Sequence, residues 1–206
     1  MHYYESHKYH ISYKINSIKE TIFSRLLPVY ENIEEEAKII AKKKLEELGK
    51  SFNPDTMDVG DAYQEAWEDG TEHYVLQHAM KVEFLLSTAT WLFHLFEKDC
   101  REMCPSLYNK PEELKKKLEE MGISCDVGSN WYKTNTELRL VANTIKHGEG
   151  KSCDRLKGIK PEYFKTNTSY LTDNKIEIPE EDMTKYIDNM SSFWDSFFDK
   201  VLPKYE

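Results

Sequence analysis

Residues 131–150, WYKTNTELRLVANTIKHGEG, carry the most specific pattern in the sequence. Steps of three and four residues place one set of side chains on a stripe that is typical of a buried helix face: Trp131, Thr134, Leu138, Val141 and Ile145. A neighbouring stripe is polar, because residues three, four, seven and eight apart share a side of a helix. It holds what we call the polar cluster: Arg139, Asn143, Lys146 and His147. Gly148 follows as the residue type that commonly ends a helix, so we expect one amphipathic helix with the polar cluster at its C-terminal end.

Two interpretations fit the polar cluster. Two cations and a histidine stabilise the negative end of a helix dipole, which is a purely structural role. The same side chains also suit an anion or phosphate site, because Arg and Lys supply charge-assisted donors and His exchanges a proton near neutral pH. The residues alone leave both interpretations open.

The rest of the chain predicts an all-α bundle of about five helices. Helical periodicity covers residues 15–48, with Pro28 as a kink or division, and residues 59–103, whose second half is apolar on several sides and is expected at the centre of the bundle. Shorter helices are expected over residues 111–122 and 179–201. A length of 206 residues fits one domain over residues 1–206.

Two segments lack a helical pattern. Residues 1–14 combine histidines and tyrosines without a clear period, so they are expected to form an N-terminal arm that is extended or contains a short strand. Residues 149–178 are expected to form an irregular insertion before the last helix. Within it, a small hairpin is predicted from residues 168–171 and 175–178, which flank Thr-Asp-Asn.

Composition sets limits on the partners. The charged fraction of 32% and the aromatic fraction of 13% are typical of a soluble globular protein, and a net charge of −9 argues against a general nucleic-acid coat protein. Residues 139–165 are different, with seven Lys and Arg against three acids, a local excess of +4 that includes Lys151. This segment is where an anionic partner is expected. No apolar run approaches the roughly 18 residues that span a bilayer, and the polar N-terminus is unlike a secretory signal, so a cytoplasmic protein without membrane contact is predicted.

No cofactor or metal is predicted. The cysteines are Cys100, Cys104, Cys125 and Cys153, and only the first two have a spacing that suits a metal. The paired motif of a structural zinc site is missing elsewhere, so reduced, buried or partly buried thiols are expected.

Glu97 is a candidate partner for the polar cluster. It shares a face of the longest predicted helix with His94 and Arg101. A carboxylate in such an apolar segment is costly to bury unless it is paired. One hypothesis is that Glu97 faces and orients the polar cluster. The other is a local surface pair between Glu97 and Arg101.

Two pieces of the sequence together resemble the HEPN superfamily. They are ATWLFHLFEK, residues 89–98, and ELRLVANTIKHGEG, residues 137–150, which is followed by a Leu and by PEYF, residues 161–164. The likeness covers residues 80–165. It implies a helical bundle that dimerises, in a superfamily with many metal-independent ribonucleases of prokaryotic toxin–antitoxin, phage-defence and CRISPR-linked systems.

The superfamily's motif is an Arg, a polar residue beside it and a His a short distance beyond. Asn143 and His147 match the polar residue and the His, whereas Ala142 stands in the Arg position. Arg139, one turn earlier with seven residues between it and His147, is the candidate replacement. The resemblance thus implies a catalytic set of Arg139, Asn143 and His147, and substrate-binding roles for Lys146, Lys151 and Glu97.

The implied partners are RNA or a nucleotide, a second copy of the chain and a cognate antitoxin protein. The last helix or the helix that bears the polar cluster would form the homodimer interface. A degenerate nuclease site would instead leave an RNA- or nucleotide-binding module. The competing class is a non-catalytic helical interaction protein, in which the polar cluster only caps its helix and pairs with Glu97.

Overall fold

The structure is a computed structural model that describes residues 3–164 and 176–202. Every regular element within those ranges is helical, so the all-α prediction is confirmed. Seven α-helices take the place of the expected five: α1 Tyr3–Thr21, α2 Ile33–Ser51, α3 Val59–Met103, α4 Pro111–Glu120, α5 Leu138–His147, α6 Lys151–Ile159 and α7 Glu180–Val201. Short π-helical or 3-10 turns complete the described chain: η1 Ile22–Leu26, η2 Leu27–Tyr30, η3 Tyr132–Glu137 and η4 Pro161–Phe164.

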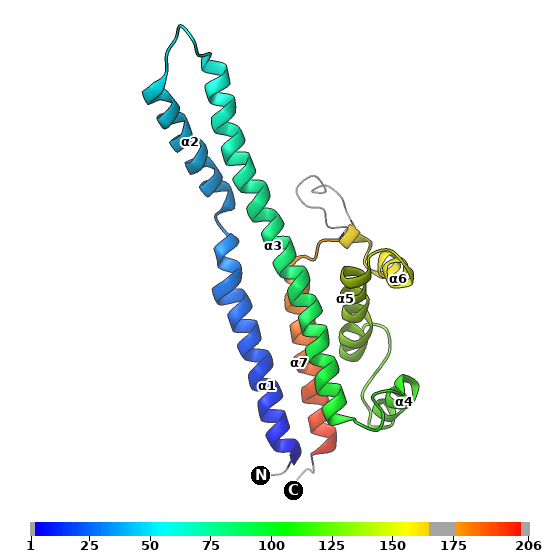
Figure 1. The fold of residues 1–206 in the computed structure, drawn as a ribbon. Coiled ribbons are helices and arrows are strands. Elements are labelled where there is room, and N and C mark those ends of the chain that lie inside the picture. The colour runs from blue at the N-terminus through cyan, green and yellow to red at the C-terminus, as the bar shows by residue number, and fades with distance from the viewer. Residues whose placement is uncertain (1–2, 165–175, 203–206) are drawn as a thin grey trace.

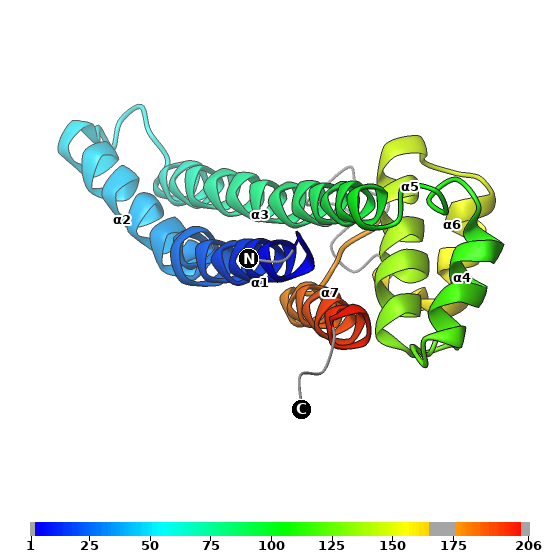
Figure 2. The same cartoon turned by 90° about the horizontal axis from the view of Figure 1, so that it is seen from below.

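The molecule is elongated, because α3 is far longer than its neighbours. Its 45 residues extend over about 68 Å. Helices α1 and α7 lie along its C-terminal half, and α4, α5 and α6 lie to one side of them (Figure 1, Figure 2). Helix α2 pairs with the N-terminal half of α3, and together they extend beyond the other helices as a two-helix projection, which we call the helical arm (residues 31–80).

Aromatic side chains join the elements of the bundle. The ring of Phe96 on α3 lies 5.9 Å from that of Trp131 and 5.5 Å from that of Phe193 on α7, and Trp131 and Phe193 are 5.2 Å apart. All three are buried. Such ring pairs each stabilise a fold by about 0.5–1.5 kcal/mol beyond the area they bury. This cluster therefore fixes the segment that leads into α5 against both α3 and α7.

The two longest helices begin and end as predicted or nearly so. Helix α3 has the predicted bounds, and Asp58 caps it by accepting a hydrogen bond from the Gly60 backbone N–H. Helix α7 starts one residue after the expected Pro179. Pro28 lies in the irregular turns that separate α1 from α2, which confirms the division of residues 15–48.

The prediction of an extended N-terminal arm over residues 1–14 is wrong from Tyr3 onward, where the chain is already in α1. Only Ile11 and Ile15 of this helix are buried, so its apolar stripe is too short to read from the sequence. Long-range contacts stabilise it instead. The Lys8 Nζ lies 2.9 Å from an oxygen of Asp199 on α7, and Lys14 pairs with the buried Asp99 on α3.

The prediction of an irregular insertion over residues 149–178 is wrong for its first part, since residues 151–159 form α6. The helix spans nine residues and buries only Cys153 and Leu156, and its third apolar residue at helical spacing, Ile159, is exposed, so the periodic signal is short. Residues 176–179 are without regular structure, so the described part of the predicted second hairpin segment, residues 176–178, is not a strand. The predicted hairpin depends on residues 165–175, which lie outside the described residues.

The apolar face of α7 is used inside the chain. Phe193, Trp194, Phe197 and Phe198 are each at most 4% exposed. This face therefore packs on the core of its own chain, against α1, α3 and the η3 segment, and the homodimer stays a prediction. No helix in the described part of the chain is long and apolar enough to cross a membrane.

Candidate functional site

The segment that carries the polar cluster begins at a capped turn. The Ser129 Oγ accepts a hydrogen bond of 3.1 Å from the Tyr132 backbone N–H, as capping serines do at helix starts. The chain then makes the π-helical turn η3 before α5 begins at Leu138. Gly148 ends α5 with a φ of 69°, a left-handed value that favours glycine.

The predicted buried stripe of this segment is confirmed. Trp131, Thr134, Leu138 and Val141 are buried, and Ile145 is partly buried against the core. Because these side chains pack on α3 and α7, they fix the rotation of α5 about its own axis. The opposite stripe must then face outward.

The polar cluster forms the solvent-facing side of α5. Successive residues of an α-helix are rotated by about 100°, so Lys146, Arg139, Asn143 and His147 follow one another within an arc of about 100°. Lys146 and His147 are exposed, and Arg139 and Asn143 are half-buried. None of the four side chains makes a hydrogen bond or ion pair with another residue of the described ranges. Their donors remain available to a ligand.

Lys151 extends this surface onto the next helix. It is the first residue of α6 and is exposed, as are Arg155 and Lys157 on the same helix. Helix α6 packs against α5 through Cys153 and Leu156, which are buried. Five of the seven basic residues of segment 139–165 therefore lie on two helices that pack against each other.

Ala142, which stands where the superfamily has its Arg, points the other way. It is 3% exposed, so a long cationic side chain at this position would face the core. Arg139 lies one helical turn before Asn143 on the outward stripe. The geometry brings Arg139, and not position 142, to the same side as Asn143 and His147.

Glu97 is not part of the polar cluster. Its Oε1 accepts a hydrogen bond from the Tyr108 hydroxyl at 3.2 Å, and its Oε2 lies 3.1 Å from the His94 Nδ1. Arg101 donates to the same Tyr108 hydroxyl at 3.3 Å, so Glu97 and Arg101 share a local surface group. The hypothesis that Glu97 faces the polar cluster is therefore wrong.

The prediction failed because Glu97 and the end of α5 that carries His147 lie at different positions along the axis of α3. Phe96 contacts Trp131, so Glu97 lies near the start of the cluster-bearing segment. His147 is at its other end, and the ten residues of α5 alone extend over about 15 Å. Spacing within one helix predicts which residues share a face, but not which part of another helix that face meets.

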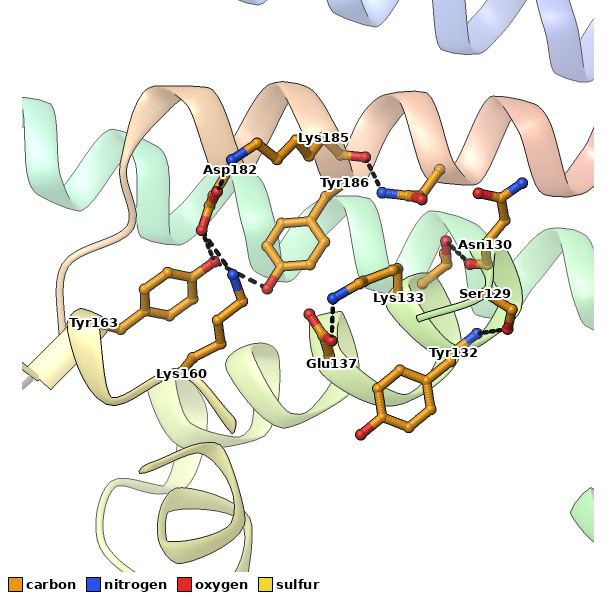
Figure 3. A network of polar contacts seen from close by, with 12 residues as sticks. Ser129, Asn130, Tyr132, Lys133, Glu137, Lys160, Tyr163, Asp182, Lys185 and Tyr186 are labelled. Carbon is orange, nitrogen blue, oxygen red and sulfur yellow. Dashed lines mark hydrogen bonds and ion pairs between the residues drawn. The ribbon is translucent and has the colours of Figure 1, made fainter. Parts of the chain in front are cut away.

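A second polar network escaped prediction from the sequence. Figure 3 shows Asp182, in the first turn of α7, receiving hydrogen bonds from the Tyr163 hydroxyl at 2.7 Å, Lys185 Nζ at 2.7 Å and Lys160 Nζ at 3.0 Å. The Tyr163 hydroxyl also lies 3.1 Å from that of Tyr186. Burial alone would raise the pKa of Asp182, but the hydrogen bonds from Lys185, Tyr163 and Lys160 outweigh it and lower the pKa to about 2.

This network holds the chain after α6 against α7. Burial and the neighbouring Tyr186 and Asp182 raise the pKa of Tyr163, so its hydroxyl stays protonated and remains a donor. Both oxygens of Asp182 have partners, which is the arrangement of a structural tether. No sequence signal could have paired these groups, because an acid in the first turn of a helix is already expected from the helix dipole.

Glu137 is the remaining buried acid next to α5. It is 4% exposed, and its Oε1 accepts a hydrogen bond of 2.5 Å from Lys133 Nζ (Figure 3). Its Oε2 has no hydrogen-bond partner among the described residues. The carboxylate lies on the inner side of the segment, whereas the polar cluster lies on the outer side, so the two do not form one site.

Metal ligands do not gather anywhere in residues 3–164 and 176–202, where no group of three or more His, Cys, Asp or Glu side chains can hold an ion. The cysteines are free thiols, three of them buried and Cys104 partly so. Burial raises the pKa of Cys100, with neighbouring Cys104 and acids adding to the effect, so this thiol is unreactive.

Within the described residues, the polar cluster lies on the outward face of α5, with Lys146 and His147 exposed and Arg139 and Asn143 half-buried. A cavity of about 810 Å³ lies near the other end of the segment, between Asn130, Trp131 and Phe193. Small-molecule sites are usually concave, so an open cationic face suits an extended anion better than a metabolite. Comparison with protein-family models, with curated proteins and with solved structures finds no match to the chain.

Proposed function

We propose that the chain is a HEPN-like RNA-binding protein that cleaves single-stranded RNA without a metal, in a prokaryotic defence or toxin–antitoxin setting. The observation that carries the proposal is the outward stripe of α5. It consists of Arg139, Asn143, Lys146 and His147, and no described residue neutralises its cations.

Charge supports an RNA ligand. Segment 139–165 carries +4 within a chain of net charge −9, and its exposed cations Lys151 and Arg155 continue the surface beyond α5. Phosphate contacts from Arg and Lys supply most of the sequence-independent affinity for nucleic acids. The C-terminal end of a helix is itself unfavourable for an anion, so these side chains must provide the attraction.

The residue types suit cleavage by the RNA's own 2′-hydroxyl. A base takes the proton of this hydroxyl, the oxygen attacks the adjacent phosphorus, and the bond to the 5′-oxygen breaks as that oxygen receives a proton. The products are a 2′,3′-cyclic phosphate and a 5′-hydroxyl. His147 serves as base or acid, Arg139 and Lys146 stabilise the phosphorane, and Asn143 orients the phosphate.

A second copy of the chain would supply the second proton-transfer group. One chain offers a single histidine on this stripe, and a symmetric dimer would bring two copies of His147 together. The surface of α5 and α6 is the candidate contact, since the apolar face of α7 is buried in its own chain.

The alternative is a helical protein that binds RNA or a nucleotide, or only another protein, without catalysis. Ala142 at the superfamily's Arg position favours it, because that position faces the core. The form of this alternative in which Glu97 neutralises the polar cluster lacks the contact it requires, because Glu97 pairs with His94 and Tyr108.

The test is cleavage of a mixed single-stranded RNA pool in EDTA, which removes contaminating metal nucleases. We expect His147→Ala and Arg139→Ala each to lower the rate by about 100-fold or more. His10→Ala and Arg25→Ala are matched controls, because both residues are exposed on or just after α1, and they should retain wild-type activity. Equal activity in all four variants would contradict the proposed site. Absence of cleavage by the wild type, with RNA binding retained, would select the non-catalytic alternative.

A further inference from the structure

One stripe of side chains on α3 is covered by the bundle in the C-terminal half of the helix (the lower half in Figure 1). The same stripe is open in the N-terminal half (the upper half in Figure 1). Steps of three and four residues define it from end to end. The lower part is buried in the bundle: Leu85, Ala89, Leu92, Phe96, Asp99 and Met103. The upper part lies in the helical arm, and its residues are exposed or half-buried: Trp67, Thr71, Tyr74, His78 and Lys81.

Helix α7 stops where the open part begins. Lys81 Nζ lies 2.5 Å from a carboxylate oxygen of Glu180, the first residue of α7. Below this ion pair, Phe193 and Trp194 of α7 pack on Phe96 of the same α3 stripe. Above it, α2 and α3 continue as a pair, and no other helix of the described residues lies beside them (Figure 1).

The open part is a groove that is apolar around Trp67 and polar towards Lys81. A depression of about 530 Å³ is lined by Ala37 and Ala41 of α2 and by Trp67, Gly70 and Tyr74 of α3. An adjoining depression of about 310 Å³ shares Tyr74 and continues to His78 and Lys81. Trp67 is 67% exposed, and an exposed tryptophan beside small residues is the type of side chain that anchors protein interfaces.

A helix is the occupant that fits this groove. The same stripe already takes a helix in its lower half, and recognition of an amphipathic helix uses anchor positions at three-, four- and seven-residue steps. From Trp67 to Lys81 the open stripe extends over about 21 Å, enough for four turns of a docked helix.

Charge identifies the kind of helix. Residues 31–80 hold 13 acids and 5 bases, a net charge of −8, which leaves −1 for the rest of the chain. Glu31 and Glu34 line the groove and form no ion pair within the described residues, while Lys38, which also lines it, pairs with Glu35. Two such arms repel each other, so pairing between the arms of two copies is disfavoured. A partner with basic flanks is favoured.

We propose that the groove between α2 and α3 binds an amphipathic helix of a partner protein, whose apolar face covers Trp67 and Tyr74 and whose flanks are basic. The docked helix lies in line with α7 above Glu180. This inference does not depend on the proposed action on RNA, since the groove and the polar cluster lie on different helices.

The probe is a synthetic amphipathic peptide of Leu and Lys, about 18 residues long, which forms a helix of about 27 Å. The control peptide has Leu at the same positions and Glu in place of each Lys. Binding is measured by calorimetry with the full chain and with Trp67→Asp. Trp91→Asp is the control, because Trp91 is also an exposed tryptophan of α3 but lines a different groove, between α1 and α3.

We expect the Leu/Lys peptide to bind, the Leu/Glu peptide to bind at least about tenfold more weakly, and Trp67→Asp to weaken binding at least about tenfold. Trp91→Asp should change binding less than about twofold. The proposal is overturned by absence of binding, by equal binding of both peptides, or by loss of binding with Trp91→Asp alone. It is also overturned if the chain is itself a dimer in solution that Trp67→Asp dissociates, since the groove would then hold a second copy.

Discussion

At the scale of single residues, a buried ion pair joins the N-terminal helix to the core. Asp99 is 1% exposed, and Lys14 Nζ lies 2.6 and 2.7 Å from its two oxygens. Burial raises the pKa of Asp99, and the hydrogen bond from Lys14 opposes this rise. The carboxylate therefore depends on Lys14, while Lys14 itself reaches water.

Lys14→Met should destabilise the chain by about 3 kcal/mol, because it leaves a buried carboxylate without its cation. Lys8→Met on the same helix is the control, since Lys8 and Asp199 form an exposed pair, and we expect a loss below about 1 kcal/mol. Urea unfolding followed by circular dichroism measures both. Similar losses in the two variants would show that burial of Asp99 does not matter.

Asp182 makes stability depend on acid pH. Its folded pKa of about 2 lies below its ordinary value of 3.8, so the native state binds fewer protons than the unfolded state between these values. The stabilisation is present above about pH 4 and is lost as the pH falls to about 2. It amounts to about 1–2 kcal/mol once solvent screening is included.

Asp182→Asn should therefore lower stability at pH 7 and flatten the acid limb of the stability curve relative to wild type. Asp188→Asn is the comparison, because Asp188 lies on the same helix in an exposed pair with Lys19. Chemical denaturation at several pH values between 2 and 7 measures the difference. If stability still falls steeply at acid pH in Asp182→Asn, other carboxyl groups cause this pH dependence.

At the scale of elements, a glycine sets how closely α2 approaches α3. A Cβ on Gly70 would lie 2.7 Å from the Ala37 carbonyl oxygen and 3.0 Å from the Ala41 Cβ. Gly49, in α2, has nothing within 4 Å of the same position. Packing therefore requires a glycine at position 70 but not at position 49, so Gly49 serves as the control for Gly70.

Gly70→Ala should destabilise the helical arm by about 1–2 kcal/mol, because the added methyl group meets a backbone carbonyl. Gly49→Ala should stabilise the chain by about 0.5–1 kcal/mol through a better helix propensity. Thermal unfolding of both variants measures whether each substitution lowers or raises the stability as expected. Stabilisation by Gly70→Ala would mean that α2 can move away without loss.

Long periodic helices could be predicted from the sequence, and short or weakly patterned ones could not. Helix α3 has a helical pattern from residue 59 to residue 103, so its bounds follow from the sequence. Helices α1 and α6 each bury only two residues; α1 depends on contacts with α7, and α6 packs on α5. Local spacing does not contain those contacts, which explains why both segments were expected to be irregular.

The same distinction applies to the candidate site. The residues that share a face of α5 follow from helix geometry, so the polar cluster and its outward stripe were predictable. The partner of Glu97 and the network around Asp182 depend on how helices are placed in three dimensions. The hypothesis for Glu97 failed because sequence spacing carries no information about height along a neighbouring helix.

At the scale of the whole molecule, both net charge and packing distinguish the helical arm from the bundle. The helical arm carries −8 and buries little, with Ile33, Ala62, Ala66 and Gly70 as its buried residues. The bundle holds the large apolar core and the basic segment 139–165. A partner for the arm and a ligand for the polar cluster can therefore bind at separate places.

Amides of the helical arm should exchange with deuterium at least about tenfold faster than those of α5 and α7, because few apolar contacts oppose its local opening. Hydrogen exchange followed by mass spectrometry resolves the two regions. Equal protection of arm and bundle would show that the arm is stabilised by contacts beyond the α2–α3 pair, such as a second copy of the chain.

The most direct measurement of the central claim is the salt dependence of single-stranded RNA binding. The logarithm of the affinity should fall linearly with the logarithm of the salt concentration, and Arg139→Ala or Lys146→Ala should each reduce the slope by about 1. Arg25→Ala, an exposed arginine that pairs with Glu20, should leave the slope unchanged. A slope that none of these variants alters, or absence of RNA binding by the wild type, would contradict the claim that the outward face of α5 is the functional surface.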